Sequence, residues 1–196
     1  MILTADEVVR SLKGSFRLLR REHDGFRAFD TSFEGFWRSF AAMILTLPAF
    51  IVLLAERRLE AGLVLADSGL FDDTALVARE ALVFVVPWIA FPLVMIGFVR
   101  IMHLEQRYVG YIVAYNWSGV IASVVFAGPA MLHVLGLATA AHAIFYTFAS
   151  CIILLQYRWF LARAALGVSG GVAAAIVAID ITVDLGVTSA LRLLVA

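Results

Sequence analysis

Charge is absent from one fifty-residue stretch of this chain. Residues 108–157 contain no Asp, Glu, Lys or Arg, and three more stretches, 39–55, 81–99 and 164–179, lack charge as well. Only 15% of the 196 residues are charged, against about 25% in a soluble domain. A spanning helix needs about 20 apolar residues, so the longest stretch is sufficient for two membrane crossings. These absences exclude a soluble domain and predict an all-α integral membrane protein.

The chain also has only one cysteine, no spacing typical of metal ligands and no formal net charge. Cys151 is the only cysteine, so neither an internal disulfide nor a CxxC motif is possible. The histidines show no HExxH or HxH pattern, and no nucleophile–base pair is evident. We therefore expect neither an enzyme nor a cofactor. Fifteen basic and fifteen acidic residues cancel, which argues against a nucleic-acid partner.

The charge-poor stretches predict a bundle of about five transmembrane helices. The expected spans are about 36–56, 80–102, 108–128, 141–163 and 169–192, within one helical domain over residues 31–196. Pro48 should kink the first span, and Gly136 is the best turn candidate before the fourth. Four spans plus a re-entrant segment, with 129–140 dipping back, is the alternative. Residues 56–80 form the longest hydrophilic connection and suit a short surface helix.

Residues 1–30 are predicted to be a cytoplasmic, basic segment, with an amphipathic helix over residues 4–22 and a linker over 23–30. The first 38 residues lack the apolar region of a signal peptide, so we expect the first span to direct insertion. Thr4 to Glu7 fit a capping box at a helix start. Val8, Leu12, Phe16 and Leu19 then recur on one side, and the helix suits either an anionic lipid surface or the protein's own cytoplasmic face. The basic residues expected at the membrane surface are Arg10, Lys13, Arg17, Arg20 and Arg21.

The distribution of Lys and Arg predicts the orientation. Five spans place eleven of these residues, Arg158 among them, on the side of the N-terminus and four on the other side. The positive-inside rule then favours a cytoplasmic N-terminus. We expect a bacterial inner (plasma) membrane.

Two acids in the last span are the most informative candidates for function. Asp180 and Asp184 are four residues apart and share a helix face. Intramembrane acids often mark ion or proton paths, but an Asp can also hydrogen-bond a neighbouring helix and stabilise packing. The sequence is compatible with both roles, ion or proton binding and helix packing. The candidates for ion or proton binding are Asp180, Asp184, Asn116 and His133.

Small residues on the same span predict a close helix contact. Gly171 lies about 180° around the helix from Asp180, so both faces look unsuited to lipid. The span should therefore be central or lie at a subunit interface, and packing within the chain is the commoner case. The helix-packing candidates are Gly167, Gly171, Ala174, Ala175 and Ala178.

Gly167-Val168-Ser169-Gly170 resembles the nucleophile motif of rhomboid intramembrane proteases. A rhomboid places its base histidine on a later helix, whereas no histidine follows position 142 here. Ser169 is instead predicted to be the N-cap of the last helix.

Two hypotheses for function follow. The first is a non-enzymatic membrane protein that acts through helix contacts, as an accessory subunit or membrane-organising factor. The alternative is a small oligomeric transporter or channel that uses Asp180 and Asp184 for proton or ion coupling. The expected partners are the lipid bilayer and either a second copy or another membrane protein.

Overall fold

The computed structural model describes residues 3–60 and 74–194, and the regular structure in these ranges is helical. Within these described ranges, five helices or helix runs are long and apolar enough to span a membrane, as predicted: Phe33–Glu60, Leu76–Ile101, Glu105–Val134, Ala140–Leu166 and Gly170–Leu191. The elements are α1 (Ala5–Leu19), the 3₁₀ helix η1 (His23–Ala28), α2 (Phe33–Ser39), α3 (Ala42–Leu45), α4 (Leu47–Glu60), α5 (Thr74–Ile101), α6 (Glu105–Val134), α7 (Ala140–Leu166) and α8 (Gly170–Leu194).

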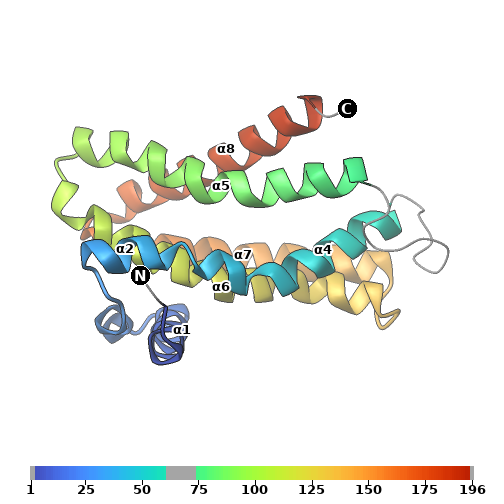
Figure 1. The fold of residues 1–196 in the computed structure, drawn as a ribbon, viewed down its shortest axis with the longest axis horizontal. Helices are drawn as coiled ribbons and strands as arrows, with labels where there is room; N and C mark the ends of the chain where they lie inside the picture. The colour runs from blue at the N-terminus through green and yellow to red at the C-terminus, as the bar shows by residue number, and fades with distance from the viewer. Residues whose placement is uncertain (1–2, 61–73, 195–196) are drawn as a thin grey trace.

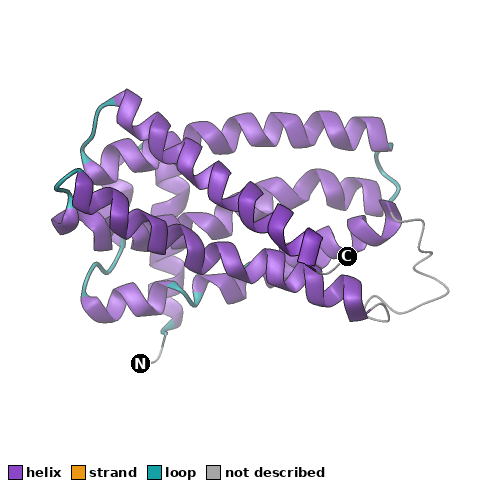
Figure 2. Cartoon of the chain, turned by 90° about the horizontal axis from the view of Figure 1, so that it is seen from above, coloured by secondary structure: helices purple, strands orange, loops and turns teal. Residues whose placement is uncertain are grey.

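The long helices lie side by side (Figures 1 and 2), and α6 contacts most of the others. It packs against α1, α2, α3, α4, α5 and α7, whereas α8 packs mainly against α5 and α7. The expectation of a central last helix is therefore wrong for the single chain. We call the end with the start of α2 and the α5–α6 and α7–α8 turns the N-terminal end, and the other the far end. Near the N-terminal end, α1 runs crosswise to the bundle (Figure 1).

Several helices are longer than predicted. The third span continues through Pro129 to Val134 instead of ending at 128, so the re-entrant alternative is not supported. A proline leaves the carbonyl four residues earlier without its helical partner. Ser150 on α7 donates a hydrogen bond of 3.2 Å to that carbonyl, on Val125, which offsets the loss. The turn that follows contains Gly136 in the left-handed region, at φ 70°, as predicted.

The first span is broken before Pro48, in agreement with the predicted kink. The backbone tightens there: the N–H groups of Met43 and Thr46 donate to the carbonyls of Phe40 and Met43, three residues earlier. Such 3₁₀ bonding accommodates a proline that would clash with an ordinary α-helical turn. The Thr46 hydroxyl also donates to the Met43 carbonyl, at 2.7 Å. The short surface helix predicted within 56–80 falls largely on 61–73, outside the described residues.

The N-terminal helix α1 packs through small and polar residues rather than through its apolar stripe. Its buried positions are Glu7, Ser11, Gly14, Ser15 and Leu18, and it contacts η1, α6 and α7. From the predicted stripe, Val8, Leu12 and Leu19 are partly buried against the core, while Phe16 is 52% exposed. Part of the predicted stripe therefore packs on the protein itself, and Phe16 remains exposed. The segment 23–30, expected to be a linker, contains η1 instead.

Candidate functional site

Asp180 on α8 is joined to two neighbouring helices. The Tyr115 hydroxyl of α6 donates to Asp180 Oδ1 at 2.6 Å, and Arg158 Nε of α7 lies 3.9 Å from Asp180 Oδ2. The two charged side chains are only 19% and 20% exposed. A charge inside a membrane span is costly unless a partner compensates it. The structure therefore supports the reading of Asp180 as a group that links helices.

Tyr115 is the centre of this contact. The Arg158 guanidinium lies over its ring, 3.8 Å from the centroid, and Phe91 of α5 stacks on it at 4.4 Å. Arg158 Nη1 also donates to the Tyr115 carbonyl at 3.4 Å. Cation–π contact and carboxylate pairing together compensate the guanidinium charge. One tyrosine thus joins α5, α6, α7 and α8.

Arg158 corrects an assignment made from the sequence. It was counted with the loop after the fourth span, but α7 continues for eight residues beyond it, to Leu166. It therefore lies about 12 Å inside the helix end. Tyr115 and Asp180 each lie ten residues from the start of their own helices, so about 15 Å inside. The three groups consequently lie at similar depth.

Other polar groups lie at this depth and connect α6 and α7 to the N-terminal elements. Asn116 Nδ2 donates to Ser39 Oγ at 2.9 Å and is fully buried. Tyr157 of α7 donates to the Ser15 carbonyl of α1 at 2.8 Å. We call the set at this level the polar belt: Arg38, Ser39, Tyr115, Asn116, Gln156, Tyr157, Arg158 and Asp180. Asn116, a candidate for ion or proton binding, therefore bonds the first span.

Arg38 connects the N-terminal segment to the bundle. Its guanidinium contacts Glu7 Oε2 at 3.0 Å, Asp30 Oδ2 at 2.5 Å and Glu34 Oε2 at 3.2 Å. The Thr4 hydroxyl caps α1 by accepting from Glu7 N–H, as predicted, at 3.2 Å. The Glu7 carboxylate binds Arg38 and so does not complete the capping box. Hydrogen bonds from Ser32, and then the nearby Arg38 charge, lower the pKa of Asp30.

The four candidates for ion or proton binding do not form one site. Asp180 binds Arg158 and Tyr115, and Asn116 binds Ser39. His133 Nδ1 lies 2.8 Å from Glu56 Oε1 near the far end, about 26 Å along α6 from Asn116. His133 and Asp180 therefore lie far apart. Asp184 is exposed, one turn beyond Asp180 on α8.

The small-residue face of α8 points away from the chain's own core. Gly171, Ala174, Ala175 and Ala178 are exposed, and a Cβ at Gly171 would meet no atom within 4 Å. This face therefore does not pack closely against another helix of the same chain. Gly167 has a different role, since it ends α7 in the left-handed conformation at φ 63°. Arg107 Nη1 donates to the adjacent Leu166 carbonyl at 2.7 Å.

Ser169 acts as the predicted cap of α8. Its hydroxyl accepts from Val172 N–H at 3.4 Å, and its carbonyl accepts from Ala173 N–H at 3.0 Å. No group of three or more His, Cys, Asp or Glu that could hold a metal ion occurs in residues 3–60 and 74–194.

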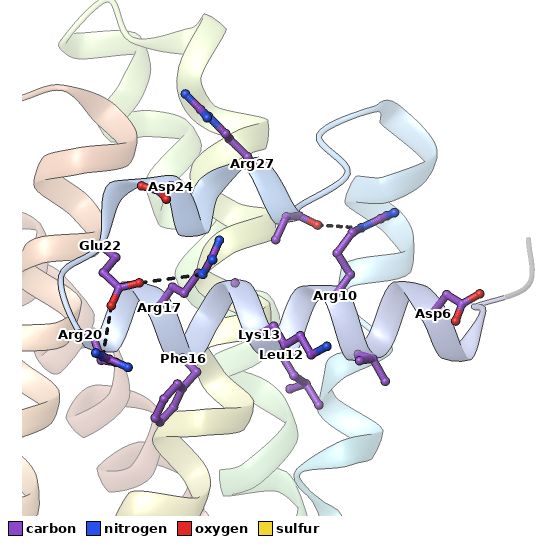
Figure 3. Close-up of a pocket in the computed structure, with 13 residues that line it drawn as sticks. Asp6, Arg10, Leu12, Lys13, Phe16, Arg17, Arg20, Glu22, Asp24 and Arg27 are labelled. Atoms are coloured by element: carbon purple, nitrogen blue, oxygen red, sulfur yellow. Dashed lines mark hydrogen bonds and ion pairs between the residues drawn. The ribbon is translucent and has the colours of Figure 1, made fainter.

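The basic residues predicted at a membrane surface have two different environments. Arg10, Lys13, Arg17 and Arg20 line an open hollow between α1 and η1 (Figure 3). Arg21 instead donates to Gln156 Oε1 of α7 at 2.6 Å. Four of the five residues thus share one surface, and the fifth joins α1 to the bundle.

Sequence reasoning missed Arg158 as the partner of Asp180, although a signal was present. Consecutive helices joined by a short turn run antiparallel, so residues at equal distance from the turn lie side by side. Arg158 is ten residues before Val168 and Asp180 is twelve after it. Arg38 was missed because its three acidic partners come from separate segments.

Comparison with known proteins gives no relative: no family model, curated protein or solved structure matches the chain.

Proposed function

We propose that this chain is a non-enzymatic integral membrane protein that acts through contacts between helices, as a subunit of a homomeric or heteromeric membrane assembly. The observation that carries the proposal is the exposed face of α8 formed by Gly171, Ala174, Ala175 and Ala178. In lipid, small residues at this spacing allow two helix backbones to approach closely.

The half of α8 beyond Asp180 gives independent support. Ile181, Thr182, Asp184 and Leu185 are all exposed there, so this part of the helix is covered little by its own chain. Asp184 lies about 21 Å from the start of α8. An acid exposed to hydrocarbon costs about 2.5–3.5 kcal/mol. A partner helix that brings a hydrogen-bond donor or a basic side chain to Asp184 would offset that cost.

Orientation with the N-terminus in the cytoplasm remains part of the proposal. Arg158 lies inside the bundle, so the Lys and Arg count at the N-terminal end falls from eleven to ten, against four at the far end. The bias expected by the positive-inside rule is retained.

The experiment compares two glycine variants of full-length protein extracted gently from membranes. Gly171→Leu places a large side chain on the small face. Gly97→Leu is the matched control, because Gly97 is likewise exposed on a span, α5, and open around its Cβ. Native mass spectrometry should show a wild-type assembly that Gly171→Leu dissociates and Gly97→Leu preserves. Unchanged stoichiometry in Gly171→Leu would contradict the proposal.

Transport through Asp180 and Asp184 stays an untested prediction, and the separation of the four candidate groups does not favour it. Asp180→Asn in proteoliposomes distinguishes the cases. Loss of a proton-coupled flux with the assembly intact would support transport, whereas lowered stability alone would support the helix-linking role.

A further inference from the structure

A charged hollow lies between α1 and η1. It has a volume of about 1110 Å³ and is lined by residues of both helices. Five lining residues are basic and three are acidic (Figure 3). The basic ones are Arg10, Lys13, Arg17, Arg20 and Arg27, and the acidic ones are Asp6, Glu22 and Asp24. The excess of positive charge indicates an anionic ligand.

The acids leave part of this charge uncompensated. Glu22 alone faces both Arg17, at 3.9 Å, and Arg20, at 3.1 Å. Lys13 and Arg27 form no ion pair with any residue in the described part of the chain. Arg10 donates its Nε–H to the Ala28 carbonyl at 3.0 Å, which leaves its terminal N–H groups available. Phosphate oxygens are suitable acceptors for these donors.

The walls of the hollow are held together by close backbone contact. A Cβ at Gly14 of α1 would collide with Ala28 and with the Gly25 carbonyl of η1. Arg21 turns the chain between the two helices in the left-handed region, at φ 62°. The shape therefore exists before any ligand binds, which lowers the cost of binding.

Two exposed apolar side chains favour a lipid over a dissolved anion as the ligand. Val9 is 49% exposed and Phe16 is 52% exposed, and their separation of seven residues places them on one face of α1. Both line the hollow among the basic residues. Such a face, on a helix crosswise to the spans (Figure 1), suits the boundary between headgroups and acyl chains.

We infer that the hollow between α1 and η1 binds the phosphate of an anionic phospholipid headgroup, while Val9 and Phe16 contact its acyl region. Arg10 and Arg17, on the side of α1 that faces η1, supply donors for the phosphate. Lys13 and Arg27 lie at opposite edges of the hollow (Figure 3), and their uncompensated charges attract the anionic headgroup. The inference rests on the proposed membrane location but not on the contact made by α8.

The test measures binding of short-chain phosphatidylglycerol to delipidated full-length protein in neutral detergent. Wild-type protein should bind it more tightly than phosphatidylcholine, and the affinity should fall with added salt. The double variant Lys13→Gln/Arg27→Gln should bind about 25-fold more weakly, because each basic residue near a lipid surface contributes about a fivefold effect. Arg100→Gln is the control, since Arg100 is exposed at the N-terminal end outside the hollow and should leave affinity unchanged.

The outcomes separate the possible sources of phosphate. Equal affinity of wild-type protein and the double variant would overturn the site. Equal affinity for phosphatidylglycerol and phosphatidylcholine would overturn the preference for an anionic headgroup. Competition by millimolar inorganic phosphate with no gain from acyl chains would show a site for free phosphate and overturn the lipid assignment. Gly171→Leu, which targets the proposed assembly, should bind lipid as wild type does, so failure of one proposal is distinguishable from failure of the other.

Discussion

The two halves of the bundle are packed differently. Towards the N-terminal end, Ile112 of α6 and Leu161 and Leu166 of α7 are completely buried. Towards the far end, Ile144 is 71% exposed, and Phe148 is 67% exposed. The first half has a buried core around the polar belt and α1, although Ile101 at its end is 79% exposed, whereas Ile144 and Phe148 of the second half face outward. The difference indicates that one half is stabilised by its own contacts and the other depends on its surroundings.

The largest effect is expected from removal of the positive charge in the polar belt. Arg158→Leu leaves Asp180 without its charge partner and should lower the free energy of unfolding by about 4 kcal/mol, the typical effect of breaking a buried pair. Unfolding by SDS in mixed micelles measures this. Arg158→Leu/Asp180→Leu should recover part of the loss. If the double variant is no more stable than Arg158→Leu, the pairing is not the cause.

A matched pair of truncations on α7 sharpens the comparison between the halves. Leu161→Ala should destabilise by about 3 kcal/mol, because it leaves a cavity in the packed half. Ile144→Ala, at a position that is 71% exposed in the far half, should change stability by less than about 0.5 kcal/mol. The same micelle titration measures both variants. Equal losses would show that the halves do not differ in packing.

A smaller effect is expected where α1 meets the bundle. Tyr157→Phe removes the hydrogen bond to the Ser15 carbonyl and should weaken docking of α1 by about 1 kcal/mol. Hydrogen exchange measured by mass spectrometry should then be faster in α1 than in wild type. Tyr146→Phe is the control, since Tyr146 is 43% exposed on the same helix. Unchanged exchange in α1 would exclude this bond as a contributor.

The smallest effect concerns pH. The pKa of Asp30 is lowered in the folded protein by hydrogen bonds from Ser32 and by Arg38. A lowered pKa contributes stability above the unfolded value, and this is lost as pH falls through the folded value. The thermal stability of the contacts made by α1 should therefore fall between pH 6 and pH 3. Asp30→Asn should abolish this fall. An identical pH dependence in the variant would show that Asp30 does not cause the loss of stability.

Much of the helical framework was predictable because its cause is local. The lack of charge over 108–157 and the other apolar stretches predicted five long helices, and five are found. Two local signals were equally predictive: Gly136 lies in the turn expected there, and Ser169 caps α8. The extension of α6 past Pro129 was not predictable, because it involves a bond from Ser150 on another helix.

The candidate site was predictable only in part, because its residues act through partners far away in sequence. Asp180 stood out by its charge inside an apolar span, which the sequence shows directly. Its partner Tyr115 is 65 residues away, and Asn116 is 77 residues from Ser39. His133 had no visible connection to Glu56, also 77 residues away. Such pairs depend on which helix faces pack together.

The sequence by itself determined the helices, their caps and their apolar character, because hydrogen bonding within a helix and the cost of exposing polar groups to hydrocarbon are local properties. Only the tertiary structure decided that α6 is central, that Arg158 meets Asp180, and that the small face of α8 is turned outward. The rotation of each helix about its axis follows from the sum of many weak contacts among all neighbours, and that sum cannot be obtained from one helix alone.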